Sequence, residues 1–177
     1  MQDNFDKGGS TSRPRVDLWR AEVYASRRLG ITLRLLCYLA VGASVLAYAV
    51  RLAMLLFESV SGGALFIAVS AVPFVLVSLL RKVINAPRPY ELIDIYPSAP
   101  KNKKGESFPS RHTFSIFLIA TLCIPWRIYV AVTLAVLGVV LAVCRVLLGY
   151  HFVRDVVAGF AVGVISGVIG ILITSFI

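Results

Sequence analysis

The sequence predicts an all-α integral membrane protein, in which a short amphipathic N-terminal helix precedes a bundle of about five transmembrane helices. Hydrophobic residues make up 58% of its 177 residues. Charged residues make up only 15%, whereas soluble domains carry about 25%. Several apolar stretches are also long enough to cross a bilayer, because about 20 helical residues span a hydrocarbon core of about 30 Å. These observations exclude an ordinary soluble domain.

The N-terminal segment is polar and basic. Residues 1–14 contain Gly, Ser, Pro and charged residues, which is typical of an unstructured tail. Over residues 16–29, apolar side chains including Trp19 recur at helical spacing among arginines, as in helices that lie in the headgroup region. A solvated helical lead-in to the first span is the alternative. The predicted domains are therefore a polar basic tail with an interfacial helix, residues 1–30, and a transmembrane domain, residues 31–177.

Five apolar stretches follow, and polar or helix-breaking residues separate them. They cover residues 31–57, 61–80, 112–124, 128–148 and 153–177. The third is the shortest, so we expect a few more residues to extend it at either end. Proline inside the second stretch, Pro73, is tolerable because neighbouring helices satisfy the freed backbone groups in a membrane bundle. Small residues in the fifth stretch predict close helix packing, and they are Gly159, Gly163, Gly167 and Gly170.

The ionisable residues near the predicted membrane concentrate in three clusters. The clusters stand at the end of the second span, the start of the third, and the junction of the fourth and fifth, so counting spans places them on one side. They comprise Arg81, Lys82 and Arg88; Ser110, Arg111 and His112; and Arg145, His151 and Asp155. Charges at membrane depth are costly unless paired or solvated, which makes them functional candidates. The sequence therefore predicts one polar site built from three separate segments.

The composition of these clusters suits a phosphate group. Four or five cations around one point form a site for a doubly charged anion, and the arginine fork matches phosphate oxygens bidentately. Ser110 adds a hydroxyl donor, and the first N–H groups of the third span add the positive end of a helix dipole. The alternative for Arg81 and Lys82 is that they are ordinary interface anchors.

The two histidines suit covalent catalysis. His151 and Asp155 are four residues apart, so a carboxylate can fix the imidazole tautomer and leave the other ring nitrogen free to attack. His112, from another span, is placed to protonate the leaving oxygen. An ordinary surface pair is the alternative for His151 and Asp155. The cationic cluster with one carboxylate is unlike a hard-metal cage, so we expect phosphoryl transfer through a phosphohistidine with no metal and no cofactor.

At these residues the chain resembles the type 2 phosphatidic acid phosphatase family (PAP2) of membrane lipid phosphatases. The family's first motif, Lys, six residues and Arg-Pro, ends here in Arg88-Pro89, with Arg81 at the lysine spacing and Lys82 one residue nearer. The second, Pro-Ser-Gly-His, appears as Pro109-Ser110-Arg111-His112. The third, Ser-Arg, five residues, His, three residues and Asp, appears as Cys144-Arg145, then His151, then Asp155. The resemblance covers roughly residues 61–175.

The resemblance implies roles for these residues. His151 is then the nucleophile, Asp155 its orienting partner and His112 the general acid. Phosphate is then held by Arg88, Ser110, Arg145 and the cation at position 81 or 82. Two residues depart from the family pattern: Arg111 replaces the glycine of the second motif, and Cys144 replaces the serine of the third. Arg111 either contacts a second phosphate or points to solvent. Many members of the family also have six spans.

The sequence thus predicts a membrane lipid phosphatase acting on a polyprenyl phosphate or diphosphate, phosphatidylglycerophosphate or phosphatidate. A lipid phosphotransferase and a non-enzymatic phosphate-binding or transport protein are the alternatives. The net charge of +9 is better explained by anionic membrane lipids than by nucleic acid, which we do not expect as a partner. The sequence gives no indication of an oligomeric state.

The cysteines and the distribution of basic residues give two further predictions. Cys37, Cys123 and Cys144 lie in apolar stretches without CxxC spacing, which predicts small buried side chains rather than disulfides or a zinc site. Of the 18 Lys and Arg, all but Arg51 and Arg127 fall on the side of the polar site, so the positive-inside rule places that site at the cytoplasmic face. The family resemblance favours the outer face of a bacterial cell membrane instead.

Overall fold

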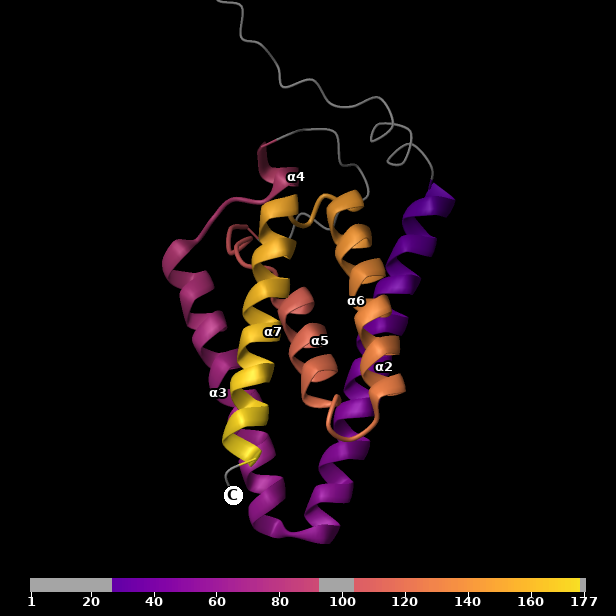
Figure 1. Ribbon diagram of the computed structural model, residues 1–177. Coiled ribbons are helices and arrows are strands. Elements are labelled where there is room, and N and C mark those ends of the chain that lie inside the picture. Colours follow the sequence, from indigo (N-terminus) through magenta and orange to yellow (C-terminus); the bar gives the residue numbers. More distant parts are fainter. Residues whose placement is uncertain (1–26, 93–103, 176–177) are drawn as a thin grey trace, which may run out of the picture.

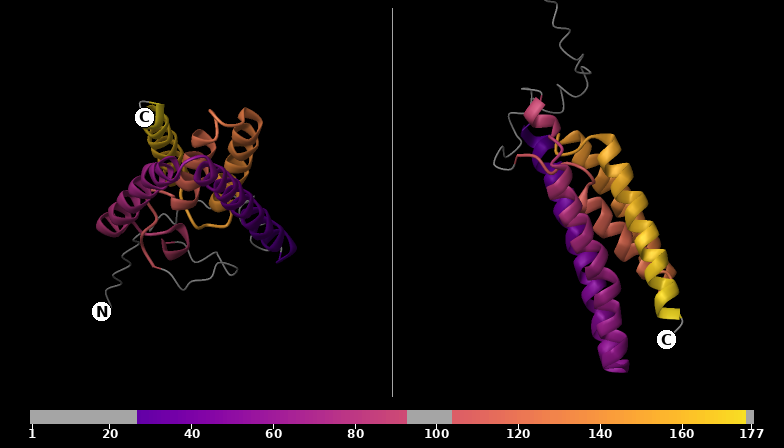
Figure 2. Two further views of the ribbon diagram at one scale, coloured as in Figure 1. Left: turned by 90° about the horizontal axis from the view of Figure 1, so that it is seen from below. Right: turned by 90° about the vertical axis from the view of Figure 1, so that its left-hand side faces the viewer.

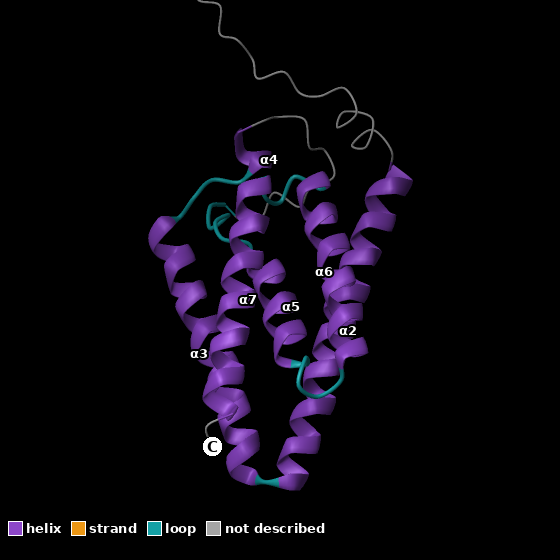
Figure 3. Cartoon of the chain, in the orientation of Figure 1, coloured by secondary structure: helices purple, strands orange, loops and turns teal. Residues whose placement is uncertain are grey.

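The computed structural model describes residues 27–92 and 104–175, which form a bundle of helices (Figures 1 and 3). In chain order the helices are α2 (Arg27–Glu58), α3 (Val60–Ile84), α4 (Pro89–Leu92), α5 (Arg111–Leu122), α6 (Ile128–Leu147) and α7 (Val153–Ser175). The described residues contain no strand. The all-α membrane fold is therefore confirmed. The predicted interfacial helix lies outside the described residues, except for its last residues, which begin α2.

Within residues 27–92 and 104–175, four segments are long and apolar enough to cross a membrane. The first is α2, the second runs from the start of α3 to the end of α4, and the third and fourth are α6 and α7. The remaining helix, α5, has 12 residues and is about 18 Å long, so the few additional helical residues that we expected at either end are not present. Its N-terminal extension is instead an irregular segment, residues 104–110, whose backbone finds partners inside the protein. Ser107 N–H donates to the carbonyl of Ala86 and Ser110 N–H to that of Asp155, as buried backbone at membrane depth requires.

Helix α5 lies at the centre of the bundle, and the long helices pack around it (Figure 2). Its closest partner is α7, as the glycines predict. A Cβ atom at Gly159 would lie 2.5 Å from the carbonyl oxygen of Ser110, and one at Gly163 would lie 2.5 Å from that of Phe114. Both distances are far below van der Waals contact, so glycine at these positions allows the two backbones to touch. The predicted close packing of the fifth span is confirmed.

The three polar clusters meet at one end of the bundle. The start of α2, the end of α3, α4, the start of α5 and the α6–α7 connection all lie at this end (Figure 1). The α2–α3 and α5–α6 connections and the C-terminal end of α7 lie at the opposite end. The predicted convergence from three segments therefore exists in the fold.

Candidate active site

His151 and Asp155 lie side by side just before and inside the first turn of α7. Gly149, with φ of +71°, turns the chain between α6 and this pair, a conformation that suits glycine. Only 2% of the His151 side chain is exposed, and Asp155 is fully buried. The Nδ1 atom of His151 stands 3.7 Å from Oδ2 of Asp155, which is an ion-pair distance rather than a direct hydrogen bond.

Ser107 fills the position between these two side chains. Its hydroxyl donates to Oδ2 of Asp155 at 2.5 Å, and its Oγ is 3.4 Å from Nδ1 of His151. The backbone N–H of Phe152 donates to the same carboxylate oxygen at 2.9 Å. Ser107 was not predicted as a site residue, because it stands in a long polar connection with no periodicity and lies 44 residues before His151. Asp155 and Ser107 together hold Nδ1 and leave Nε2 as the free ring nitrogen.

The surroundings of His151 favour its neutral form. Burial is the main cause that lowers its pKa, and the charges of Arg88, Arg145 and Arg81 lower it further. The nearby carboxylate of Asp155 opposes them, but the pKa stays below the usual value for histidine. At neutral pH the ring therefore carries a lone pair on Nε2, as a nucleophile requires.

Arg81 connects α3 to the segment before α5. Its side chain is only 4% exposed, and its terminal nitrogens donate to the carbonyl oxygens of Glu106 and Pro109, with Ser107 O at 3.5 Å. The next residue, Lys82, is exposed. Of the two cations that the sequence left open for this position, Arg81 is the one that lies at the site.

Arg88 approaches the site from the chain before α4. Its side chain is buried, and its Nε donates to the carbonyl of Gly105 at 2.9 Å. A guanidinium has five N–H donors, and the bond to Gly105 occupies one of them. Glu91 fixes the same contact, because its Oε1 accepts from the backbone N–H of Arg88 at 3.1 Å and from that of Gly105 at 2.7 Å.

Arg145 and His112 share a cavity of about 150 Å³ at the same end of the bundle. Side chains of α2 and Tyr150 complete its walls. The guanidinium of Arg145 lies over the ring of Tyr150, 5.1 Å from its centroid. Its buried Nε has no hydrogen-bond partner among the described residues. An unpaired buried donor is costly, so this nitrogen is available for an anion that enters the cavity.

The start of α5 supplies further donors. Ser110 is fully buried, and its Oγ lies 3.0 Å from Oγ1 of Thr113, where either hydroxyl is able to donate. The first N–H groups of a helix have no intrahelical acceptor and favour an anion at this end. Arg111 takes a different direction, because its guanidinium lies 5.7 Å from the ring centroid of Phe74 on α3. It therefore packs on an aromatic face instead of pointing into solvent.

The cysteines are buried and unpaired, as the sequence predicts. Cys144 packs in the same apolar cluster as Cys37 of α2. The residue that replaces the serine of the third motif thus faces the helix interface, while its neighbour Arg145 lines the cavity.

The model of the PAP2 superfamily matches residues 62–176, about two thirds of the chain. The chain belongs to the PAP2 superfamily. The structure is similar to two solved structures, LpxE from Aquifex aeolicus and a PAP2-type phosphatidylglycerolphosphate phosphatase from Bacillus subtilis. The first is 24% identical, covers 89% of this chain and 97% of that one, and gives a TM-score of 0.65. The second is 21% identical, covers 90% and 92%, and gives 0.58. No curated protein sequence matches the chain.

The PAP2 match includes all nine residues that the sequence singled out. Most of them lie together at one end of the bundle, while Lys82 is exposed and Arg111 packs toward α3. The resemblance stated from the motifs is therefore confirmed at the level of the family. Membership of PAP2 and the membrane-spanning helices support a phosphatase that acts on membrane lipids.

Proposed function

We propose that this PAP2 protein hydrolyses a lipid phosphate through a phosphohistidine on His151. The observation that carries the proposal is the orientation of the imidazole. Its Nδ1 faces Ser107 and Asp155, so Nε2 is the atom available for attack. Three arginines act electrostatically on the same ring, which is the environment that a phosphate dianion requires.

The first step transfers the phosphoryl group to the protein. Arg88, Arg145 and the N–H groups that begin α5 hold the phosphate oxygens and stabilise the charge that develops on them. The lone pair on Nε2 of His151 forms the new N–P bond while the bond between phosphorus and the lipid oxygen breaks. His112, at the start of α5, takes up a proton when the phosphate dianion binds and then donates this proton to the leaving oxygen. The lipid alcohol, or the lipid monophosphate in the case of a diphosphate substrate, then departs.

The second step returns the enzyme to its starting state. Water takes the position of the departed alcohol, and His112, now neutral, accepts a proton from it. The resulting oxygen attacks phosphorus, the N–P bond breaks, and inorganic phosphate leaves. No step of this scheme uses a metal ion or a cofactor. Asp155 and Ser107 stabilise the charge on the His151 ring as it forms the N–P bond, and Arg81 holds the segment that carries Ser107.

The substrate that we propose is a polyprenyl phosphate or diphosphate, phosphatidylglycerophosphate or phosphatidate. The site lies at the end of a bundle whose outer surface is apolar, so a phosphate at the headgroup level reaches it while the lipid stays in the bilayer. The solved Bacillus subtilis relative is a phosphatidylglycerolphosphate phosphatase, which supports this class of substrate.

Phosphate release by the purified protein in detergent tests the proposal. The three lipid classes are supplied in the presence of a chelator, and a His151→Ala variant that keeps its thermal stability is measured in parallel. The proposal expects release that survives chelation and is lost in the variant. Transfer of phosphate to an added alcohol with little release would indicate a phosphotransferase. Phosphate binding without turnover, equal in both proteins, would indicate a binding or transport protein.

We also propose that the site faces the cytoplasm of a bacterial cell. This proposal rests on the uneven distribution of basic residues between the two membrane faces. Arg51 and Arg127 are the two basic residues predicted for the face opposite the site. Arg51 lies near Trp126 there, with its guanidinium 5.8 Å from the ring centroid. Other members of the family favour the outer face, so the side is a separate proposal from the chemistry.

A further inference from the structure

An apolar groove opens between α6 and α7 beside the candidate active site. Its volume is about 520 Å³, and its lining comes from α5, α6 and α7. Although α6 and α7 follow one another in the chain, they touch each other little, because α7 packs mainly on α5, and α6 packs on both α5 and α2. Their facing sides are therefore open to lipid. Val143 on α6 and Val157 on α7 form part of the walls and are 52% and 57% exposed.

The groove begins at the phosphate site. Thr113, which lines it, has its Oγ1 3.0 Å from Oγ of Ser110. Val156 also lines it and directly follows Asp155 in the chain. On the opposite wall, Val146 follows Arg145. A lipid whose phosphate occupies the site therefore has an apolar path leading directly away from it.

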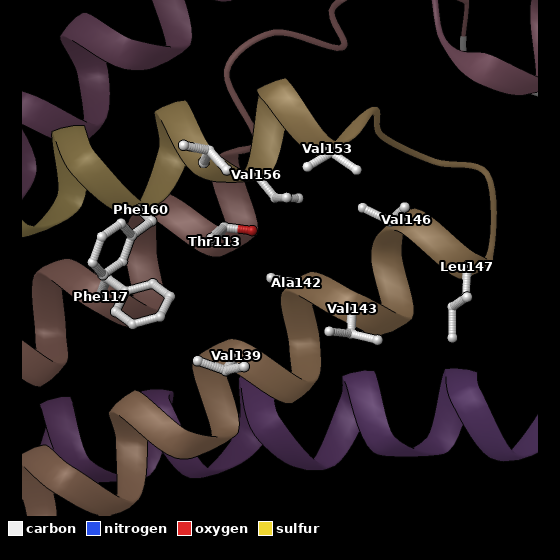
Figure 4. A pocket seen from close by; sticks show the side chains of 11 residues that line it. Thr113, Phe117, Val139, Ala142, Val143, Val146, Leu147, Val153, Val156 and Phe160 are labelled. Carbon is white, nitrogen blue, oxygen red and sulfur yellow. The ribbon is translucent and has the colours of Figure 1, made fainter.

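Two aromatic rings mark the far end of the groove. Phe117 of α5 and Phe160 of α7 meet edge to face, with ring centroids 4.7 Å apart and an interplanar angle of 85°. Figure 4 shows this pair at one end and Val146 and Val153 at the other, with Thr113, Val156 and Ala142 between them. Along α7, the distance from Val153 to Phe160 is about 10 Å. The groove is thus a short pocket that the two aromatic rings close at the end far from the site.

We propose that this groove binds a hydrocarbon chain of the lipid phosphate along its whole length, from the phosphate site to the two aromatic rings. The inference rests on the proposed function. Its support is the continuity with the site, which a second apolar groove lacks. That groove, of about 440 Å³, lies between α3 and α7, and its α7 lining starts at Ser166. Ser166 is 11 residues beyond Asp155, about 16 Å along the helix, so on α7 this second groove does not reach the site.

The expected effect of the groove is on positioning. A chain that moves from the bilayer into the groove leaves one apolar environment for another, so hydrophobic burial contributes little to binding. Contact along the groove walls instead fixes the angle at which the lipid oxygen meets His112 and His151. Misplacement by about 1 Å costs as much as 100-fold in rate. Filling the groove should therefore impair lipids with long chains and spare those with short ones.

Substitution of wall residues by tryptophan tests the proposal. Val157→Trp and Val143→Trp fill the groove from its two sides. Ile169→Trp is the matched control, because Ile169 is also on α7, is 51% exposed and lines the second groove. The measurement is kcat/KM for dioleoyl phosphatidate and for dibutanoyl phosphatidate. We expect both groove variants to lose at least about tenfold on the long-chain lipid and less than about twofold on the short one, while the control behaves as the unsubstituted protein.

The outcomes separate the two proposals. If the unsubstituted protein hydrolyses both lipids and the groove variants match Ile169→Trp, the groove proposal is wrong and the proposed function stands. Equal losses on both lipids in the groove variants would also refute the groove, because they would indicate a disturbed active site. If the unsubstituted protein hydrolyses no lipid phosphate, the proposed function fails and the groove proposal fails with it.

Discussion

Replacement of Gly159 by alanine perturbs the contact that holds the two halves of the site together. The new Cβ would lie 2.5 Å from the carbonyl oxygen of Ser110 and 3.2 Å from the backbone nitrogen of Phe114. Ordinary contact begins near 3.4 Å, so α5 and α7 must separate by about 0.9 Å at this point. Both neighbours are backbone atoms, so no side chain is able to rotate away. Overpacking of this kind costs about 1–3 kcal/mol of stability.

The same displacement also separates the catalytic groups. Ser110 N–H donates to the carbonyl of Asp155 at 2.8 Å, and an added 0.9 Å would lengthen this bond to about 3.7 Å, beyond hydrogen-bond range. His151 and Asp155 then move away from Ser110 and His112. A misplacement of about 1 Å is worth up to 100-fold in rate, so we expect kcat of Gly159→Ala to fall by about that factor.

Gly167→Ala is the matched control for this experiment. It lies on the same helix, and its Cβ would also come within 2.5 Å of α5, at Cβ of Thr121. It is eight residues farther from the site, about 12 Å along α7. The assay is phosphate release from phosphatidate by both variants, with thermal unfolding measured in parallel. We expect comparable loss of stability in both and loss of kcat in Gly159→Ala alone. Equal activity losses, or full activity of Gly159→Ala, would refute the reasoning.

Three further predictions follow from the site and its orientation. Ser107→Ala should lower kcat by about 10- to 100-fold with KM nearly unchanged, because the Asp155 carboxylate loses a hydrogen bond worth about 1.5–3 kcal/mol; an unchanged kcat would show that Ser107 does not position the pair. Burial and neighbouring arginines lower the pKa of His151. As the pH falls, the ring therefore stays neutral until the pH is below the usual pKa of a histidine. The acid limb of kcat/KM should therefore lie below about pH 6.5, and a limb above that value would contradict the assignment. Finally, alkaline phosphatase fused to the C-terminus should be active in a bacterial host, because the end of α7 lies on the outer face of the membrane if the site is cytoplasmic. An inactive fusion would place the site on the outer face.

The spans and most of the site were predictable because their signals are local. Apolar stretches bounded by charges and turns give the limits of α2, α3, α6 and α7 within a few residues. The spacing of Arg145, His151 and Asp155 is likewise a property of a short stretch of sequence, so the motif could be recognised without knowing the fold. The glycines of α7 predicted a close neighbour, although they did not identify that neighbour as α5.

The parts that the sequence did not predict depend on tertiary contacts. Ser107 gains its role only because the segment before α5 folds back into the bundle and is fastened there by Arg81 and Glu91. The exposure of Lys82 depends on how the last turn of α3 is rotated, which is set by packing and not by the spacing of charges. The apolar groove was also invisible, because valines facing lipid and valines facing a substrate chain are the same residue type in the same pattern.

Direct detection of the covalent intermediate tests the proposed phosphohistidine mechanism. The protein is mixed with lipid whose phosphate is radiolabelled, the reaction is stopped within milliseconds, and the denatured chain is digested and its peptides are identified. The proposed mechanism predicts an acid-labile, alkali-stable phosphoryl group on the peptide that contains His151. This label should be absent from the His151→Ala variant. Rapid turnover with no labelled protein at any time, or label on His112, would contradict it.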